Sequence, residues 1–279
     1  MGPEPKRPSR KPSRADARRQ AETRNGLMKI AGGLGVVALV AVIWFQVSSS
    51  RRDLNPDTLC PAEPESITVL IVDVTDPMNM PQRQDFQNQL AALRNSIPRY
   101  GQLIVAKVDA TGDKLISPVI VKCNPGTAAD ENDRTGDPQA VQRKHDTEFV
   151  APLDAAFASI SQASGADQSP ILESVQSIAL TELLTPAASD KPRKIVLVSD
   201  LLQNTADISF YGDLPDAGSF TTSAPFRRVR TDLRNVEVEL WMLERGDAAT
   251  TQPRALVDLW DQIIAKQGGT VSRAYNVSG

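Results

Sequence analysis

Hydrophobic residues along the chain form short continuous runs that alternate with segments of helical periodicity. Apolar runs of strand length occupy residues 67–73, 103–108, 115–121, 194–199, 236–242 and 270–275. Apolar residues at helical spacing occupy residues 82–97, 149–160, 171–183 and 255–266. Strands that alternate with amphipathic helices predict an α/β fold: a doubly wound, mostly parallel sheet flanked by helices. Pro118 places the third run at an edge of this sheet, because proline cannot donate to a strand ladder.

Two long segments break this alternation. Residues 123–146 are polar, so we expect a loop, and the single histidine of the chain, His145, is expected to be a solvated loop residue. Residues 203–235 are irregular and carry aromatic side chains that either pack the segment onto the domain or contact a partner. Trp241 and Trp260 fall on faces that point to the core.

An uncharged apolar run near the start of the chain is typical of a membrane span. Residues 30–47 contain no charge, and adding Gly26, Leu27 and Met28 brings the run near the roughly 20 residues that cross a bilayer as a helix. We predict a transmembrane helix at 27–47, after a disordered basic head at 1–26 and before a linker at 48–65. The alternative is a signal peptide that is cleaved near residues 47–49.

Charge is distributed unevenly between the head and the rest. Residues 1–29 carry nine Lys or Arg and three acidic residues, a net charge of +6, which leaves −9 for the remainder. The positive-inside rule then predicts a cytoplasmic N-terminus and a single-pass protein of the inner (plasma) membrane, with residues 66–279 in the periplasm or outside the cell. A domain this acidic repels phosphates, which argues against binding of nucleic acid.

The two cysteines agree with a location outside the cytoplasm. Cys60 precedes the first strand, and Cys123 follows the third apolar run. Two thiols in an oxidising compartment usually pair, so we predict a disulfide between Cys60 and Cys123 that ties the linker to the sheet edge. Two unpaired buried thiols are the alternative.

Two of the apolar runs end in aspartate. Asp73 ends the run VLIVD, and Asp200 follows the run KIVLVS. In doubly wound sheets, ligands bind beyond the carboxyl ends of the strands, where the strand order reverses. If these two strands are neighbours, their carboxylates converge on such a place.

The residues around these aspartates resemble the von Willebrand factor type A family and its metal-ion-dependent adhesion site. That motif is Asp-x-Ser-x-Ser after the first strand, a Thr in a later loop and an Asp after the fourth strand. The corresponding residues here are Asp73, Thr75, Ser169 and Asp200. The resemblance implies that these oxygens bind Mg²⁺ or Ca²⁺, both of which prefer oxygen ligands.

The chain departs from this motif at two positions. Pro77 replaces the second serine, and Leu201 stands where a glycine usually follows the later aspartate. The alternative is therefore a turn without metal, in which Asp73 and Thr75 cap local backbone donors. In that interpretation Ser169 is only the cap of the following helix.

These features predict a membrane-anchored, extracytoplasmic binding domain that contacts other membrane or envelope proteins in an envelope or secretion-type assembly. Binding is either dependent on a divalent ion or independent of it. One alternative is an inert structural component of a membrane complex. The other is a phosphatase-like hydrolase that uses Asp73, but no phosphate-binding loop or nucleophile motif accompanies it, so we do not expect an enzyme or a small-molecule substrate.

Overall fold

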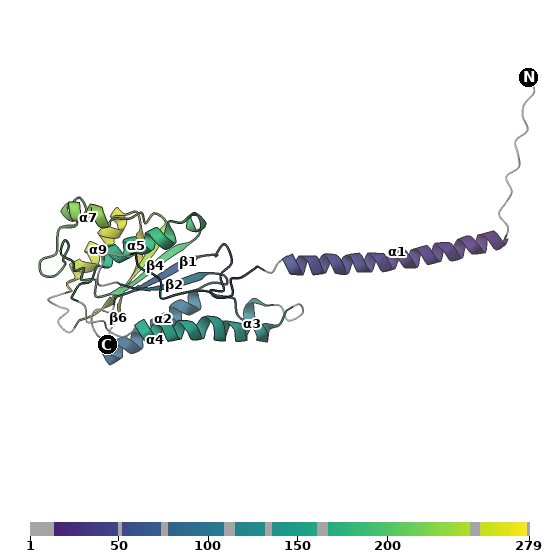
Figure 1. The fold of residues 1–279 in the computed structure, drawn as a ribbon, viewed down its shortest axis with the longest axis horizontal. Helices are drawn as coiled ribbons and strands as arrows, with labels where there is room; N and C mark the ends of the chain where they lie inside the picture. The colour runs from purple at the N-terminus through teal and green to yellow at the C-terminus, as the bar shows by residue number, and fades with distance from the viewer. Residues whose placement is uncertain are drawn as a thin grey trace, which may run out of the picture. The chain divides into compact units, whose positions relative to one another are not determined.

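The computed structural model of the protein describes residues 14–49, 52–73, 78–108, 115–131, 136–160, 167–245 and 252–277, with side chains of the first helix described for residues 28–45. The chain divides into two compact units, Met1–Asp53 and Leu54–Gly279. Figure 1 shows helix α1 (Arg14–Ser49), which belongs to the first unit. Within α1, Met28–Phe45 is long and apolar enough to cross a membrane, which agrees with the predicted membrane span.

Helix α1 begins earlier than the predicted boundary. A disordered head was expected at residues 1–26, whereas residues 14–26 are helical. This segment, RADARRQAETRNG, is rich in Ala, Arg, Gln and Glu, which are strong helix formers. Local propensity therefore favours extending the apolar helix backwards into the charged segment.

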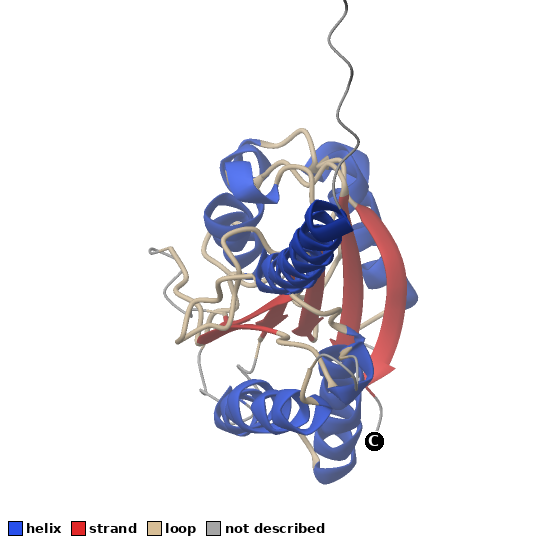
Figure 2. Cartoon of the chain, turned by 90° about the vertical axis from the view of Figure 1, so that its right-hand side faces the viewer, coloured by secondary structure: helices blue, strands red, loops and turns tan. Residues whose placement is uncertain are grey.

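The second unit is built on one mixed sheet of six strands (Figure 2). The strands are β1 (Ile67–Val72), β2 (Gln102–Lys107), β3 (Ile120–Cys123), β4 (Arg193–Ser199), β5 (Val236–Leu243) and β6 (Thr270–Val277). Their order is β3-β2-β1-β4-β5-β6, and only β3 is antiparallel to its neighbour. The predicted doubly wound, mostly parallel sheet is confirmed. The strand order reverses between β1 and β4, so this is the topological switch point.

Helices cover both faces of this sheet (Figure 1). One layer contains α2 (Met80–Ser96), α3 (Pro138–Lys144) and α4 (Ala151–Ile160), while the other contains α5 (Ile171–Ile178), α7 (Ala224–Val229) and α9 (Arg254–Lys266). The other elements within the described residues are η1 (Ala128–Asp130), η2 (His145–Val150), η3 (Ala179–Leu183), η4 (Pro186–Ala188) and α6 (Ala217–Phe220). Asn79 and Gln82 form a capping box at the start of α2, with Pro81 in the first turn, where a proline is compatible with a helix.

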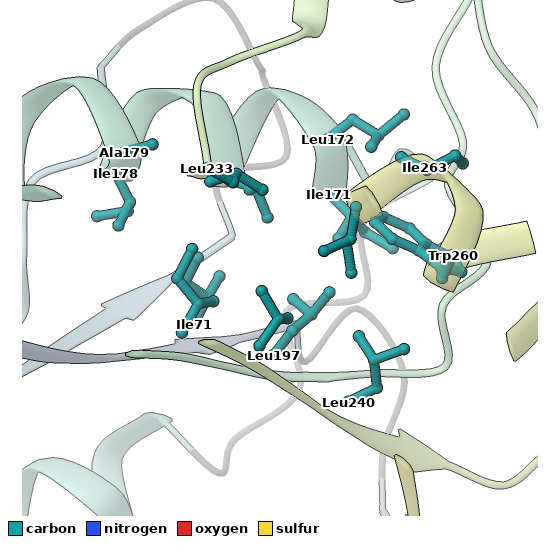
Figure 3. Close-up of a cluster of buried hydrophobic side chains, with 14 of the residues drawn as sticks. Ile71, Ile171, Leu172, Ile178, Ala179, Leu197, Leu233, Leu240, Trp260 and Ile263 are labelled. Atoms are coloured by element: carbon teal, nitrogen blue, oxygen red, sulfur yellow. The ribbon is translucent and has the colours of Figure 1, made fainter. Parts of the chain in front are cut away.

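The central strand β1 supplies side chains to two hydrophobic cores. Val69 and Ile71 pack in the core beneath α5 and α9, and Leu70 and Val72 pack in the core beneath α2 and α4. This alternation is the two-residue period of a strand buried on both faces, and it explains why the run is continuously apolar. Figure 3 shows the first core, in which Trp260 of α9 lies beside side chains of α5 and the sheet.

Two predictions about residues 115–146 are wrong. The third strand begins at Ile120 rather than at residue 115, since Pro118 has no N–H for the ladder. His145 lies in η2 instead of a loop, and its side chain is only 12% exposed. The centroid of its ring lies 5.5 Å from that of buried Phe149, with the two planes tilted by 44°, so the imidazole contributes to packing.

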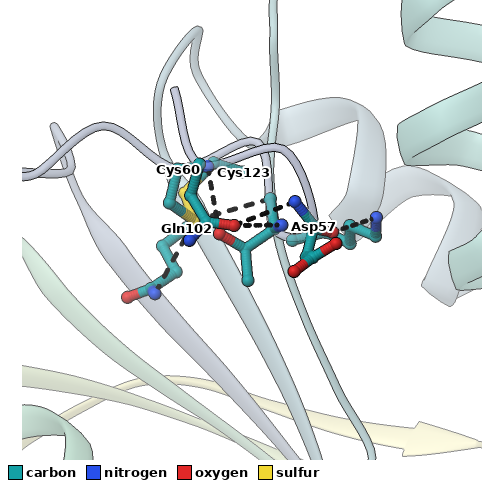
Figure 4. Close-up of a disulfide and its surroundings, with 7 residues drawn as sticks. Asp57, Cys60, Gln102 and Cys123 are labelled. Carbon is teal, nitrogen blue, oxygen red and sulfur yellow. Dashed lines mark hydrogen bonds between the residues drawn. A yellow bond between two sulfur atoms is a disulfide. The ribbon is translucent and has the colours of Figure 1, made fainter. Parts of the chain in front are cut away.

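The predicted disulfide joins Cys60 to Cys123 (Figure 4). The Cys123 N–H also donates to the Thr58 carbonyl oxygen at 2.8 Å, and Cys123 pairs with Gln102, the first residue of β2. Lys191, just before β4, forms an ion pair with Glu63 at 3.6 Å. The beginning of the second unit therefore runs along the amino ends of the parallel strands, which leaves the carboxyl ends at the opposite edge.

Candidate functional site

Asp73 lies directly after β1 at the switch point and is 3% exposed. Its backbone N–H donates to the Val198 carbonyl oxygen of β4 at 2.8 Å, which continues the sheet by one residue. Its Oδ2 accepts hydrogen bonds from two hydroxyls, Ser169 at 2.5 Å and Ser199 at 3.0 Å. The carboxylate is therefore held by side chains from two other segments of the chain.

Ser169 reaches Asp73 because a short pairing holds its segment in place. Ser169 and Asn204 exchange backbone hydrogen bonds, each at 2.9 Å. The N-cap position of α5 belongs to Pro170, and the Gln203 side chain accepts from the Leu172 N–H at 2.9 Å. The interpretation of Ser169 as a side-chain cap of this helix is therefore wrong, because its hydroxyl bonds to Asp73 instead.

Asp200 lies directly after β4 and is 6% exposed. Its Oδ1 accepts the Leu202 N–H at 2.9 Å, while its Oδ2 accepts Nε of Arg245 at 2.6 Å and also contacts a terminal guanidinium nitrogen of Arg245. Ser199 lies between the two carboxylates, with its hydroxyl oxygen 3.4 Å from Asp200 Oδ1. The two aspartates and Ser169 come together as the sequence predicted, and Arg245 joins them.

A buried glutamine fixes the position of Arg245. The Gln252 Oε1 atom accepts the backbone N–H of Arg245 at 2.7 Å. Its Nε2 donates to the carbonyl oxygens of Asp200 and Leu243, both at 2.9 Å. One side-chain amide, 7% exposed, thus ties the chain after β5 to the turn after β4.

Burial and the positive charge of Arg245 act in opposite directions on the pKa of Asp200. Burial raises the pKa of its carboxyl, and the negative charge of Asp73 adds to this. The Arg245 guanidinium and the Leu202 N–H both lower the pKa, but burial outweighs them. Arg245 stays protonated throughout the physiological range, so it is a permanent positive charge beside the two aspartates.

Thr75, the fourth predicted metal ligand, lies outside the described residues, as do Asp76 and Pro77. Within the part of the chain that the structure describes, no three His, Cys, Asp or Glu side chains gather in a way that could hold a metal ion. Of the four predicted ligands, the structure therefore describes three: Asp73, Ser169 and Asp200.

These three residues fit Mg²⁺ or Ca²⁺ only in part. The Ser169 hydroxyl donates its proton to Asp73, which leaves its lone pairs able to face a cation, so this pair fits. Asp200 does not fit, because Arg245 already contacts Oδ2 and the Leu202 N–H occupies Oδ1. A divalent ion could bind Asp200 directly only after the guanidinium had moved away.

Three residues of this site were not predicted from the sequence: Ser199, Arg245 and Gln252. Ser199 and Arg245 had a readable signal, since each is a polar residue at or just beyond the carboxyl end of a buried strand. The same rule identified Asp73 and Asp200. Gln252 had no such signal, because its three partners are backbone groups that only the folded chain brings together.

The aromatic residues of 203–235 are divided between the core and the surface. Phe210, Phe220 and Phe226 are buried, and the ring of Phe210 contacts the rings of Phe220 and Trp260 in edge-to-face geometry. These phenylalanines pack the segment onto the domain. Tyr211 is 47% exposed instead, and its hydroxyl lies 3.4 Å from Arg245 at the site.

The sequence matches no protein-family model and no curated protein. The chain is similar in structure to an aerotolerance-related membrane protein from Bacteroides fragilis (10% identity, TM-score 0.36), covering 77% of this chain and 92% of that one. It is also similar to the protein BatB from Bacteroides thetaiotaomicron (11%, 0.35), with coverage of 76% and 91%. A third similar structure is a von Willebrand factor type A protein from Catenulispora acidiphila (12%, 0.37), with coverage of 75% and 38%. The family that the residues around Asp73 and Asp200 resemble is thus among the proteins to which this chain is similar in structure.

Proposed function

We propose that this protein is a single-pass membrane protein whose second unit lies outside the cytoplasm and binds another envelope protein. The binding surface is the edge of the sheet that carries Asp73, Ser169, Asp200 and Arg245. The observation that carries the proposal is the convergence of these side chains at the switch point between β1 and β4. Open α/β sheets use this place to bind ligands.

The position of the linker supports this choice of surface. Residues 54–63 are attached to the amino ends of the strands by the disulfide and the Glu63–Lys191 ion pair. The carboxyl edge is therefore free of the segment that leads to the membrane span. A partner can approach Tyr211 and Arg245 at this edge without displacing the linker.

Catalysis by Asp73 is the second candidate function, and the contacts of this residue do not favour it. A phosphatase nucleophile needs a carboxylate oxygen that can reach the substrate. Asp73 is 3% exposed, and its Oδ2 accepts two hydroxyl protons. These contacts suit a residue that orders the site more than one that attacks a substrate.

Photo-cross-linking in cells tests the proposed binding surface. A photoreactive phenylalanine analogue replaces Tyr211 in one variant and Leu180 in a control. Leu180 is 54% exposed and lies near Arg234 and Gly268, which precede β5 and β6. We expect a discrete cross-linked protein from position 211 and none from position 180.

The outcome of the same experiment separates the alternatives. Cross-links from neither position, with both variants folded and in the membrane, would favour an inert structural role. A cross-link from position 211 that disappears with a chelator would favour the divalent-ion-dependent binding expected from the motif. A cross-link that persists would favour binding without an ion.

A further inference from the structure

We propose that Arg245 is the resident cation of this site and occupies the place that a divalent ion would take beside Asp200. The inference concerns the cation alone. It extends the proposed function by identifying Arg245 as the positive charge that neutralises the binding edge. Its test needs no partner protein.

Two nearly buried carboxylates at one place require positive charge. Asp73 and Asp200 are 3% and 6% exposed, and the Ser199 hydroxyl contacts both. Like charges held together away from water are costly unless a cation compensates for them. Arg245 provides this cation from within the chain.

The contact between Arg245 and Asp200 uses the oxygen that an ion would need. Nε and a terminal nitrogen of Arg245 both lie on Oδ2 of Asp200. The other oxygen, Oδ1, accepts the Leu202 N–H. Direct binding of Mg²⁺ to Asp200 would bring a doubly charged ion against a guanidinium, so the two cations exclude each other.

The placement of Arg245 is built into the fold, unlike that of a surface ion pair. Gln252 binds the backbone of Arg245 and the carbonyl oxygen of Asp200 with the same side-chain amide. Gln252 therefore holds the backbone of Arg245 beside the turn that carries Asp200. By contrast, Arg228 and Asp207 form a pair at 2.8 Å in which both side chains are 63% exposed, and such pairs contribute little.

Titration of Mn²⁺, as a stand-in for Mg²⁺, into the full-length protein in detergent micelles tests the proposal. We expect no saturable binding at the site in the wild type. Arg245→Gln should bind Mn²⁺ saturably, with an affinity at least about tenfold above the highest affinity that the wild-type titration allows, because the competing charge is removed. The gain should disappear in Arg245→Gln/Asp200→Asn. Arg228→Gln, which removes an exposed arginine from its aspartate, should leave Mn²⁺ binding unchanged.

A second variant keeps the proposal testable if Arg245→Gln fails to fold. Arg245→Lys retains the charge and should continue to exclude Mn²⁺. Saturable binding of Mn²⁺ to the wild type that is lost in Asp200→Asn would overturn the proposal, as would a folded Arg245→Gln that gains no affinity. Failure of the cross-link from position 211 would leave these results untouched, since no partner takes part in the titration.

Discussion

The indole of Trp260 donates its Nε1–H to the carbonyl oxygen of Leu201 at 2.8 Å. Leu201 follows Asp200 and has a φ of 63°, in the left-handed region that L-residues rarely adopt. Both residues are almost completely buried. The turn that presents Asp200 is therefore held from the core by α9, which explains how a leucine remains where the related motif has a glycine.

Substitution of Leu201 separates the strain of this turn from the burial of its side chain. Leu201→Ala keeps the positive φ and loses the buried side chain, so it should destabilise the protein by about 2–5 kcal/mol. Leu201→Gly loses the same side chain but relieves the backbone, so it should be about 1 kcal/mol more stable than the alanine variant. Urea unfolding of the full-length protein in micelles measures both. A glycine variant as stable as the wild type would contradict this expectation, because the relief of strain would then offset the whole loss of side-chain burial.

Gln252 should be more important for stability than a glutamine usually is. Gln252→Ala leaves the Arg245 N–H and the carbonyl oxygens of Asp200 and Leu243 without their partner. The expected loss in the free energy of unfolding is roughly 2–4 kcal/mol, because buried polar groups without partners are costly. Gln262→Ala, which removes an exposed glutamine from α9, is the control and should change stability little. Equal effects in the two variants would contradict the role of Gln252.

The residues of this site differ in how far the sequence predicts them. Asp73 and Asp200 follow apolar runs, and the order of strands and helices brings the ends of β1 and β4 together. Continuous apolar runs and a topological rule were sufficient to predict that the two aspartates lie close together. Ser169 came from the resemblance to a known motif, and the structure places its hydroxyl on Asp73.

Gln252 depends on contacts that no local pattern encodes, and the position of Arg245 just beyond β5 does not reveal which carboxylate it pairs with. Gln252 binds backbone groups near the ends of two strands, and Arg245 crosses from the end of β5 to a residue 45 positions earlier. The π-helix η2, which precedes α4, was not predicted for a related reason. His145 looks like a loop residue in isolation, but its ring packs against Phe149 four positions along the same helical segment.

The ionisation of Asp200 should make stability fall as pH rises. Its pKa is raised in the folded protein, mainly by burial, so the folded state binds a proton more tightly than the unfolded chain. The stabilisation from this group is complete below the unfolded pKa of about 3.9. It is lost as pH rises through the folded pKa. The difference in unfolding free energy between wild type and Asp200→Asn, measured across this range, should follow that direction.

Arg245 should limit this shift. In Arg245→Gln the positive charge beside Asp200 is gone, so the pKa of the carboxyl should rise further and the pH window should extend upwards. Carbon-13 NMR of the aspartate side chains, with Asp200→Asn for assignment, measures the change. A lower pKa in the Arg245→Gln protein would contradict the ion pair.

The disulfide should contribute a substantial part of the stability of the second unit. Cys60 and Cys123 are separated by 63 positions, and a cross-link over a loop of this size typically contributes about 2–5 kcal/mol. Cys60→Ser should lower the free energy of unfolding by this amount, and Cys60→Ser/Cys123→Ser should match it. A dithiol reductant should weaken the wild type but not the double variant. Wild-type protein that unfolds at the same urea concentration with and without reductant would contradict this role.

The redox state of these cysteines in cells also tests on which side of the membrane the second unit lies. If the basic N-terminus stays in the cytoplasm and the span at 28–45 crosses the bilayer, Cys60 and Cys123 reach an oxidising compartment. In rapidly quenched cells, a maleimide reagent of high mass should then modify the full-length protein only after reduction. Deletion of residues 28–45 should retain the chain in the cytoplasm, where both thiols are reduced and react at once. Immediate reaction of the full-length protein, with correct insertion into the membrane, would place the second unit on the cytoplasmic side.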